Sequence, residues 1–281
     1  MSPTAATSLY ALIGKPVAGN PTQEMLEAAF AGAGLDARYV SLEVEPAALA
    51  DAVRGLRALG ARGAHVTVPH KVAVVPLLDR LTDVARLVGA VNCIRREGDG
   101  LVGDNTDGAG FLTSLRRLVD PKGTSVVVIG AGGAARAIAA ELSRAGAARI
   151  AVVNRTLARA EEVAAAIGAP CEATQLTERW TVPAEAEIVV QATTVGMDDA
   201  EARLPLAWRD GAGIAADVVI VPPRTAFLRD AETAGRQTLS GIEMLVEQAV
   251  LGFRWWTGIE PDAAAMRGAL LRELGIEPVA A

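Results

Sequence analysis

The residue with the clearest chemical potential is Lys71, because the chain contains three lysines against twenty-four arginines. It ends the segment 66–71, V-T-V-P-H-K. An amine can accept a proton and return it, whereas a guanidinium is always protonated. The segment 103–108 (G-D-N-T-D-G) supplies Asp107, a carboxylate that could orient the ammonium. Taken alone, Lys71 could be a solvated residue at a helix start and Asp107 a helix N-cap. Together they predict proton transfer.

A glycine-rich turn predicts a nucleotide site. The segment 130–135, G-A-G-G-A-A, matches G-x-G-x-x-G/A and lies between a β-branched run and an Ala-rich stretch. Gly130 would permit a tight turn, Gly132 would let the backbone approach a pyrophosphate, and Ala135 would keep helix and strand close. The alternative is an ordinary turn between a strand and a helix. We expect dinucleotide contacts at Gly130, Ala131, Gly132, Gly133 and Ala134.

The end of the next predicted strand selects the form of the dinucleotide. Chains that bind NAD usually place Asp or Glu here, against the ribose 2′-hydroxyl. This chain has Asn154 instead, followed by Arg155, Thr156 and, one turn later, Arg159. Two guanidiniums and a hydroxyl can hold a 2′-phosphate that a carboxylate would repel. Alternatively, the two arginines could be solvated charges on a helix, but that interpretation does not explain why the usual acid is missing. These residues therefore predict NADP.

The elements that must position these residues alternate along the chain. In the first half, periodicity predicts strands at 9–13, 38–44 and 64–68, helices at 21–33 and 46–59, and a hairpin from 90–96 to 101–103. In the second half it predicts helices at 107–118, 134–145, 157–167 and from 241 onward, and strands at 125–129, 149–153, 188–191 and 214–219. This alternation predicts an α/β protein with mainly parallel sheets, the second of them a Rossmann-type doubly wound domain.

Read together, the motifs resemble those of the shikimate dehydrogenase family. The segments that hold Lys71 and Asp107 match its T-x-P-x-K and N-T-D patterns. Further matches follow in the family's order at 89–92 (G-A-V-N), 130–134, 192–197 (A-T-T-V-G-M) and 241–248. The resemblance implies an α/β substrate-binding and catalytic domain over 1–107, completed by C-terminal helices at 241–281. It also implies a Rossmann-type NADP-binding domain over 108–240.

The resemblance also implies roles for individual residues. Lys71 and Asp107 would be the catalytic pair of a hydride transfer that oxidises a ring alcohol to a ketone. The other assignments are Asn92, Gln248 and Thr67 around the substrate, and Thr193, Met197 and Gly241 at the cofactor. Asn92 could alternatively be a turn residue and Gln248 an amide on a helix surface.

One motif departs from the family pattern. In G-x-P-x-x-x-S-x-S-P the two serines hold the substrate carboxylate, but 14–21 reads G-K-P-V-A-G-N-P, two residues shorter and without serine. Asn20 and Thr22 are candidate replacements, because a helix that starts at Pro21 offers N–H groups and a dipole that favour an anion. However, Pro21 lacks an N–H and Asn20 suits the N-cap. The family's pocket tyrosine and two of its asparagines are replaced by Ile220, His65 and Gln191.

The chemistry is therefore predicted more firmly than the substrate. We expect an NADP-dependent oxidoreductase that interconverts 3-dehydroshikimate and shikimate, or a closely related cyclic polyol. Quinate, an aminoshikimate or a carboxylate-free cyclitol are alternatives, and we favour a substrate altered at the carboxylate end. A second possible function is nucleotide binding without catalysis, as in an inactive paralogue. The presence of both Lys71 and Asp107 argues against it. A folate-linked methylene dehydrogenase is disfavoured, because its Tyr-x-x-x-Lys element is missing.

Composition excludes several other classes. The net charge of −6 and the lack of a Lys/Arg run argue against nucleic acid. No apolar stretch approaches the roughly 20 residues that cross a bilayer, and the N-terminus lacks an export signal. Cys93 and Cys171 lie far apart and His65 and His70 flank one motif, so no metal site is expected. We expect a cytoplasmic enzyme of aromatic amino acid biosynthesis, monomeric or homodimeric, with a small-molecule substrate.

Overall fold

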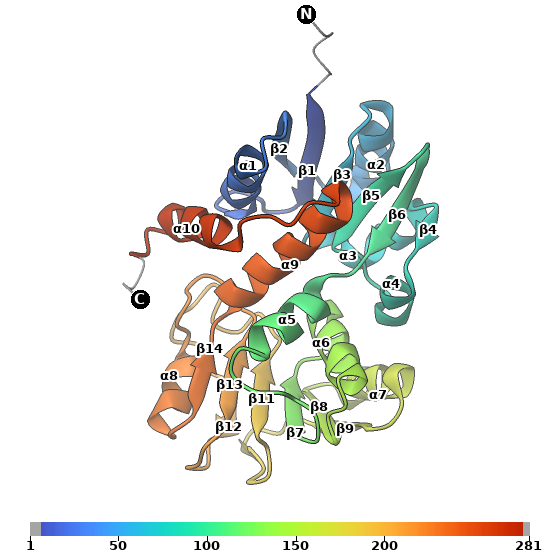
Figure 1. Cartoon of the computed structure of the whole chain (residues 1–281). Helices are drawn as coiled ribbons and strands as arrows, with labels where there is room; N and C mark the ends of the chain where they lie inside the picture. Colours follow the sequence, from blue (N-terminus) through green and yellow to red (C-terminus); the bar gives the residue numbers. More distant parts are fainter. Residues whose placement is uncertain (1–6, 278–281) are drawn as a thin grey trace, which may run out of the picture. The chain divides into compact units, whose positions relative to one another are not determined.

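The computed structural model describes residues 7–277 and divides into two compact units, each with a six-stranded sheet (Figure 1). Unit 1 runs from Met1 to Thr106 and from Gln248 to Ala281, and unit 2 runs from Asp107 to Glu247. Residues 1–6 and 278–281 lie outside the described residues. The first of these ranges holds most of the N-terminal stretch in which we expected no export signal. Parallel strand pairing in both units confirms the predicted α/β class.

The sheet of unit 1 is mixed, in the order β2-β1-β3-β5-β6-β4. Its strands are β1 (Ser8–Gly14), β2 (Ala37–Glu43), β3 (Gly63–Val66), β4 (Arg80–Leu81), β5 (Cys93–Glu97) and β6 (Gly100–Asp104). The first three are parallel, because helical crossovers connect them, whereas β5 and β6 form the predicted antiparallel hairpin. The parallel strands β1, β2 and β3 therefore end at one edge, which we call the unit 1 carboxyl edge.

Helices cover the sheet of unit 1. They are α1 (Thr22–Gly32), α2 (Leu49–Ala58), α3 (His70–Ala73), α4 (Asp83–Val88), the second part of α9 (Gly241–Thr257) and α10 (Ala263–Glu273), with 3₁₀ turns at Pro46–Ala48 and Val75–Leu77. Val53 and Leu56 of α2 pack onto Ala64 and Val66 of β3 in a buried apolar cluster. Helix α1 contacts α10 (Figure 1).

The C-terminal region forms two helices, and the position of the break between them was not predicted from the sequence. Helix α9 ends at Thr257, and Gly258 follows with φ +72°. Asp262 then begins α10, because its carboxylate accepts hydrogen bonds from the N–H groups of Ala264 and Ala265. A glycine in the left-handed region after a helix and an Asp cap before the next are local signals that the sequence prediction overlooked.

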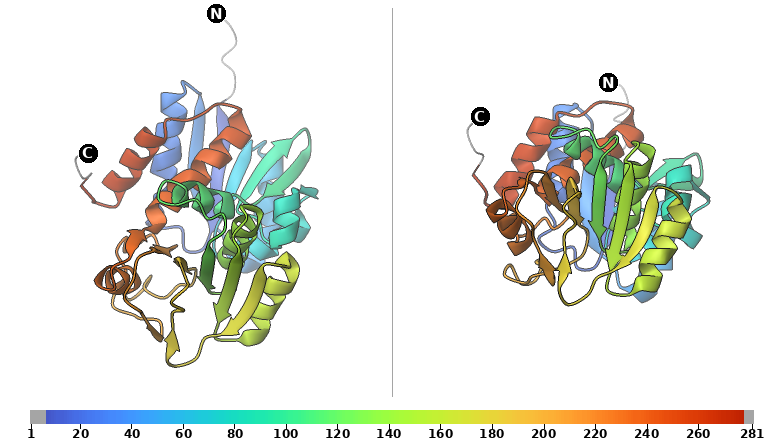
Figure 2. Two further views of the ribbon diagram at one scale, coloured as in Figure 1. Left: turned by 60° about the horizontal axis from the view of Figure 1, so that its bottom comes forward. Right: turned by 90° about the horizontal axis from the view of Figure 1, so that it is seen from below.

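The sheet of unit 2 is parallel throughout, in the order β14-β13-β11-β7-β8-β9. Its strands are β7 (Ser125–Ile129), β8 (Arg149–Asn154), β9 (Cys171–Gln175), β11 (Ile188–Gln191), β13 (Ile214–Asp217) and β14 (Gln237–Leu239). Figure 2 shows β7 to β9, in green to yellow, beside one another. The prediction missed β9 and β14, because these edge strands are largely half-buried or exposed and carry a weak apolar signal.

Both faces of this sheet are buried. The helices are α5 (Asp107–Leu115), α6 (Gly133–Arg144), α7 (Leu157–Ile167) and α8 (Ala226–Thr233), and a small ribbon pairs β10 (Trp180–Thr181) with β12 (Leu206–Ala207). Val126 and Val128 of β7 pack with residues of α5, α6 and α7, whereas Val127 and Ile129 pack with Phe227 of α8. Burial on two sides explains the continuous apolar run of β7.

Candidate functional site

The unit 1 carboxyl edge brings together residues from distant parts of the sequence. Gly14 at the end of β1 lies beside Glu43 at the end of β2, and Ile13 pairs with Val66 of β3. A Cβ on Gly14 would lie 2.2 Å from Cγ2 of Thr67, so the position requires glycine. The candidate Thr67 is therefore packed directly against the start of the loop that follows β1. In open α/β sheets, ligands bind outside the carboxyl ends of the strands.

A cluster of three polar side chains lies at the same edge, and all three are buried. The amide of Asn92 donates to Oγ1 of Thr106 over 3.0 Å and to Oε1 of Gln248 over 3.1 Å. Its Oδ1 accepts from the backbone N–H of Thr106 over 2.8 Å. The structure thus joins Asn92 and Gln248, 156 positions apart, through mutual hydrogen bonds. Thr106 was missed as a site residue although it lies inside the G-D-N-T-D-G segment.

The backbone around Lys71 is fixed on both sides. Lys71 lies in the short helix α3, and its carbonyl accepts from Val91 N over 2.8 Å, which ties α3 to the segment that contains Asn92. The preceding His70 is buried, and its Nε2 lies 2.7 Å from the carbonyl oxygen of Val44. The Lys71 side chain is half-buried and projects from this rigid segment. Rigid attachment is what a residue that transfers a proton needs.

Asp107 begins α5 in unit 2 and follows Thr106 in the chain. Within unit 1, Asn92 is hydrogen-bonded to the N–H and the hydroxyl of Thr106, the residue that precedes Asp107. The adjacent Gly108 has no room for a side chain, since a Cβ would lie 2.3 Å from the carbonyl oxygen of Ala137 in α6. Within unit 2, this glycine lets α5 pack closely on the helix that follows the nucleotide turn.

The candidates for carboxylate binding are arranged differently from the prediction. Helix α1 begins at Thr22, with Pro21 at the N-cap, so Asn20 is not the N-cap residue. Asn20 instead forms a local turn, in which its Oδ1 accepts from the backbone N–H of Thr22 over 3.0 Å. The proline in the cap position shifts the helix start by one residue. Thr22 is buried and Asn20 is half-buried.

His65, which replaces an asparagine of the family pattern, belongs to an aromatic cluster in unit 1. Its Nδ1 lies 2.9 Å from the hydroxyl of Tyr39, and its ring centroid lies 4.6 Å from that of Trp256. Gly252 makes room for it, since a Cβ there would lie 2.7 Å from Nε2 of His65. Burial raises the pKa of Tyr39 well above its ordinary value, so this phenol remains a neutral hydrogen-bonding group. The cluster serves packing.

The nucleotide turn of unit 2 has the backbone geometry that the motif predicts. Gly130 has φ +120°, and a Cβ would lie 2.7 Å from the carbonyl oxygen of Ala192, so only glycine fits. Gly132 is the N-cap of α6, which lacks a side-chain cap, and a Cβ there would meet no atom within 4 Å. The turn therefore leaves open space in front of backbone N–H groups at a helix N-terminus. This is where a pyrophosphate fits.

The end of the second strand of unit 2 and the residues after it are also positioned for an anion. Asn154 ends β8, and its amide donates to the carbonyl oxygen of Thr156 over 2.9 Å, which closes the turn. Arg155, Thr156 and Arg159 are exposed. Within residues 7–277 neither of these two arginines forms an ion pair, so both guanidiniums are accessible to an anion. They fit the 2′-phosphate of NADP.

A second buried polar cluster lies at the carboxyl ends of β11 and β13. Gln191 pairs with Asp217 in register, and its amide donates to Oδ1 of Asp217 over 3.2 Å. Its Oε1 accepts from the backbone N–H and the hydroxyl of Thr193, each over 2.6 Å. Burial raises the pKa of Asp217 to about 6. Gln191 thus links a carboxyl group to Thr193, and the signal that could have identified Asp217 is an acid at the end of a buried strand.

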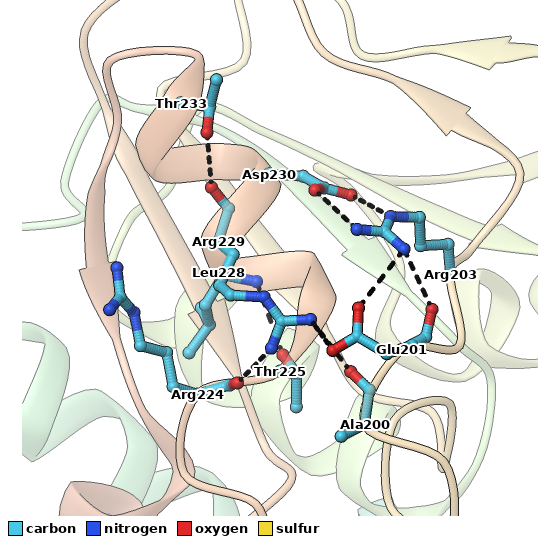
Figure 3. Close-up of polar contacts among 9 residues, drawn as sticks. All are labelled: Ala200, Glu201, Arg203, Arg224, Thr225, Leu228, Arg229, Asp230 and Thr233. Atoms are coloured by element: carbon cyan, nitrogen blue, oxygen red, sulfur yellow. Dashed lines mark hydrogen bonds and ion pairs between the residues drawn. The ribbon is translucent and has the colours of Figure 1, made fainter.

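The remaining cofactor candidates surround this cluster within unit 2. Met197 is 49% exposed and follows Gly196, where φ is +94°. Gly241 begins α9, and a Cβ there would lie 2.5 Å from the carbonyl oxygen of Val219. After Met197, a network of ion pairs and hydrogen bonds links the loop to α8 (Figure 3), in which Arg203 contacts both carboxylate oxygens of Asp230. The segment that holds Thr193 and Met197 is therefore anchored at both ends.

Other kinds of site receive no support from the described residues. Between residues 7 and 277, no three His, Cys, Asp or Glu side chains are grouped so as to hold a metal ion. None of the helices in this range is long and apolar enough to span a membrane. Both cysteines are free thiols, and burial raises the pKa of Cys171 to about 11, so that thiol stays protonated and weakly nucleophilic.

Family models match three stretches of the chain. The shikimate dehydrogenase substrate-binding domain matches residues 12–94, the shikimate/quinate 5-dehydrogenase model matches 114–197, and the shikimate 5′-dehydrogenase C-terminal domain matches 241–271. The three matches occupy most of the chain, and their order agrees with the order of the motifs.

Individual relatives align over nearly the full length. The NADP-dependent shikimate dehydrogenase of Geobacter metallireducens is 43% identical, over 98% of this chain and 99% of its own. A 5-ketofructose reductase from a Gluconobacter strain superimposes with a TM-score of 0.88 and 43% identity, covering 95% of this chain and 98% of the other. A Thermus thermophilus shikimate 5-dehydrogenase, solved with NADP(H) and shikimate, gives 0.87 and 36% identity over 95% and 99%.

Proposed function

The chain belongs to the shikimate dehydrogenase family, and on that premise we propose that it interconverts a secondary alcohol of shikimate, or of a closely related polyol, and the corresponding ketone with NADP. The observation that carries this proposal is the buried cluster of Asn92, Thr106 and Gln248, hydrogen-bonded together beside the fixed segment of Lys71. Amides and a hydroxyl in this arrangement suit the ring hydroxyls of a polyol.

In the oxidative direction, the substrate loses a proton from its hydroxyl oxygen and a hydride from the carbon. NADP, when bound, accepts the hydride. Lys71 accepts the proton through its amine as the carbonyl forms, and it returns the proton in the reverse reaction. Asp107 orients the ammonium and shares the substrate hydroxyl, while Asn92 and Gln248 hold neighbouring hydroxyls. Thr67 lines the same pocket.

Unit 2 residues would hold the cofactor in three places. The turn from Gly130 to Ala134 binds the pyrophosphate through backbone N–H groups and the N-terminus of α6. Asn154 and Thr156 shape the end of β8, where Arg155 and Arg159 bind the 2′-phosphate. Thr193, Met197 and Gly241 border the nicotinamide. This proposal is supported by the open space at Gly132 and by the absence of ion pairs at both arginines within residues 7–277.

The substrate could come from either of two classes. The first class is shikimate with its 3-dehydro ketone, since several relatives are shikimate dehydrogenases. Quinate and aminoshikimate belong to the same class, because they differ from shikimate in the ring and its substituents and keep the carboxylate. A polyhydroxy ketone without a carboxylate is the second, since a 5-ketofructose reductase is as similar to this chain as the shikimate dehydrogenases are. We place the reaction in the cytoplasm and expect a monomer or a homodimer, which light scattering would decide.

The test is a steady-state assay of the purified chain that follows NADPH by absorbance. Shikimate, quinate, aminoshikimate, cyclitols and 5-ketofructose would each be tested, with NADP(H) and with NAD(H). We expect turnover of at least one substrate and a preference for NADP. If calorimetry showed NADPH binding but no substrate turned over, the chain would be a nucleotide-binding paralogue.

A further inference from the structure

The loop that follows β1 lies beside an acidic group. Gly14 pairs in register with Glu43, and the backbone N–H of Val17 in the loop faces Oε2 of Glu43 over 3.4 Å. Glu43 is exposed, and its acidic side chain lies at the end of β2, at the unit 1 carboxyl edge. A substrate carboxylate held by this loop would meet a like charge.

The loop has one cation, and that cation is already paired. Lys15 forms an ion pair with Glu45, and the two side chains are 39% and 63% exposed. With Glu43 included, these three side chains carry a net charge of −1. Lys15 therefore supplies little attraction for an anion, because a substrate carboxylate would compete with Glu45 for it.

The backbone at the start of α1 offers few N–H groups to an anion. Oδ1 of Asn20 accepts from the N–H of Thr22, which takes up the first N–H of α1, and Pro21 has no N–H to offer. Val17 is buried and apolar. Glu24 lies in the first turn of α1 and opposes the attraction of the helix N-terminus for an anion. Nothing in residues 14–24 reproduces the pair of hydroxyls that the family pattern places here.

The opposite part of the edge is intact. Asn92 is hydrogen-bonded to Thr106 and Gln248, and Thr67 packs against Gly14. The part that recognises hydroxyls is therefore separate from the part that has become acidic. The polar cluster suits the hydroxyls of a neutral polyol, and the acidic side chain of Glu43 disfavours an anion.

We infer that the natural substrate is an uncharged polyhydroxy ketone, with the matching polyol as product, and that Glu43 excludes substrates that carry a carboxylate. This inference rests on the proposed NADP-dependent hydride transfer and specifies its substrate class. The ketone gains the hydride at carbon and a proton at oxygen, so no further reactant is needed. Glu43 takes no part in the hydride or proton transfer, and it affects only which substrates bind.

The experiment compares matched substrates on wild type and Glu43→Gln. We expect 5-ketofructose or a neutral cyclitol to exceed shikimate and quinate in kcat/KM by about 10²-fold, which is the loss expected when two hydroxyl donors to a carboxylate are missing. Glu43→Gln should raise the shikimate value several-fold and leave the ratio among neutral substrates unchanged. Added salt should raise the wild-type shikimate value in the same direction, because it screens the exposed charge.

Asp51→Asn is the matched control, because it removes an exposed acid from α2 with the same change in net charge. It should not alter the ratio between shikimate and the neutral substrates. A shikimate kcat/KM above that of every neutral substrate would overturn the inference and leave the proposed function intact. A Glu43→Gln substitution that left the ratio of kcat/KM between shikimate and the neutral substrates unchanged would also overturn it.

Binding separates failure of the inference from failure of the proposed function. Calorimetry with the NADP-bound chain should show a neutral polyol binding more tightly than shikimate. If no substrate turned over, the proposed hydride transfer would fall, and the inference that rests on it would fall with it, whatever the order of affinities. If shikimate bound more tightly, or if neither class bound, the inference would be wrong.

Discussion

The carboxyl edges of the two sheets follow the same physical plan but depart from the family pattern to different degrees. In unit 2, the groups that would hold the cofactor are largely backbone atoms, and Gly130 is forced by φ +120° and by its contact with Ala192. In unit 1, recognition of the substrate end depends on side chains of a loop, and there both expected serines are missing. Glu43 stands beside that loop instead.

The difference follows from what each edge must recognise. A pyrophosphate is common to all dinucleotides and is bound by N–H groups, so any side chain at Gly130 would destroy the turn. A loop such as 14–21 tolerates a shorter length and new side chains, because the sheet beneath it is held by its own core. Substrate choice can therefore change while the cofactor site and the proton-transfer residue stay the same.

The largest expected effect concerns Lys71, for which we propose proton transfer at the edge of unit 1. Lys71→Ala should lower kcat by about 10²- to 10⁴-fold, the usual contribution of a positioned acid or base. Lys71→Arg should be nearly as inactive, because a guanidinium keeps the charge but cannot accept a proton.

Steady-state kinetics on the best substrate would measure both Lys71 variants. The exposed Lys122→Ala, in unit 2, is the control and should retain wild-type activity. If Lys71→Arg kept more than half of the wild-type kcat, Lys71 would contribute charge alone and the proposed mechanism would have to be given up.

The next effect tests the side-chain part of the unit 2 edge. Arg155→Ala combined with Arg159→Ala should lower the preference for NADP over NAD by about 10²-fold, since each charge-assisted hydrogen bond contributes about 1.5–3 kcal/mol. The ratio of kcat/KM with the two cofactors measures it. Arg144→Ala, an exposed charge in the last turn of α6, should leave the ratio unchanged. A double variant that still preferred NADP as strongly as wild type would refute the assignment.

A third effect concerns the buried carboxyl of unit 2. Burial raises the pKa of Asp217 to about 6 from 3.8, so the folded chain holds this proton more tightly than the unfolded chain does. The resulting stabilisation is complete below about pH 4 and is lost as the pH rises through about 6. Relative to Asp217→Asn, wild type should therefore lose about 2–3 kcal/mol of unfolding free energy between pH 4 and pH 7.

Urea unfolding of both proteins across this pH range would measure the loss. The substitution itself changes hydrogen bonds to Gln191 and Thr225, but that contribution is an offset that does not vary with pH. A difference between the two proteins that stayed constant from pH 4 to pH 7 would show that Asp217 does not titrate in this window.

The smallest expected effect concerns the exposed network of Figure 3. Arg203 contacts both oxygens of Asp230, yet both side chains are more than a third exposed, so solvent screens their attraction. A double-mutant cycle with Arg203→Ala and Asp230→Ala should give a coupling free energy of about 0.5–1 kcal/mol by urea unfolding. A coupling several times larger would mean that this network, and not the backbone alone, holds the segment from Thr193 to Met197.

The sequence by itself determined the α/β class, the motif order and most strands and helices. Strand β7, helix α7 and strand β11 have the predicted ends, because each is bounded by turn residues and carries an unambiguous apolar pattern. The prediction missed the edge strands β9 and β14, because solvent exposure weakens the apolar pattern of an edge strand. It also missed the break between α9 and α10, because capping residues determine where a helix ends and the next begins. The form of the cofactor could also be predicted, because it depends on consecutive residues.

Only the tertiary structure decided which side chains meet. It joined Asn92, Thr106 and Gln248, it linked Gln191 to Asp217, and it placed Glu43 beside the loop after β1. These contacts join positions far apart in the chain, and strand register places Gln191 beside Asp217 and Glu43 beside Gly14. Periodicity reports how a residue lies relative to its own element, whereas substrate recognition depends on how several elements end at one edge. That is why motifs could predict the chemistry and a substrate altered at its carboxylate end, whereas the position of Glu43 beside the loop after β1 required the tertiary structure.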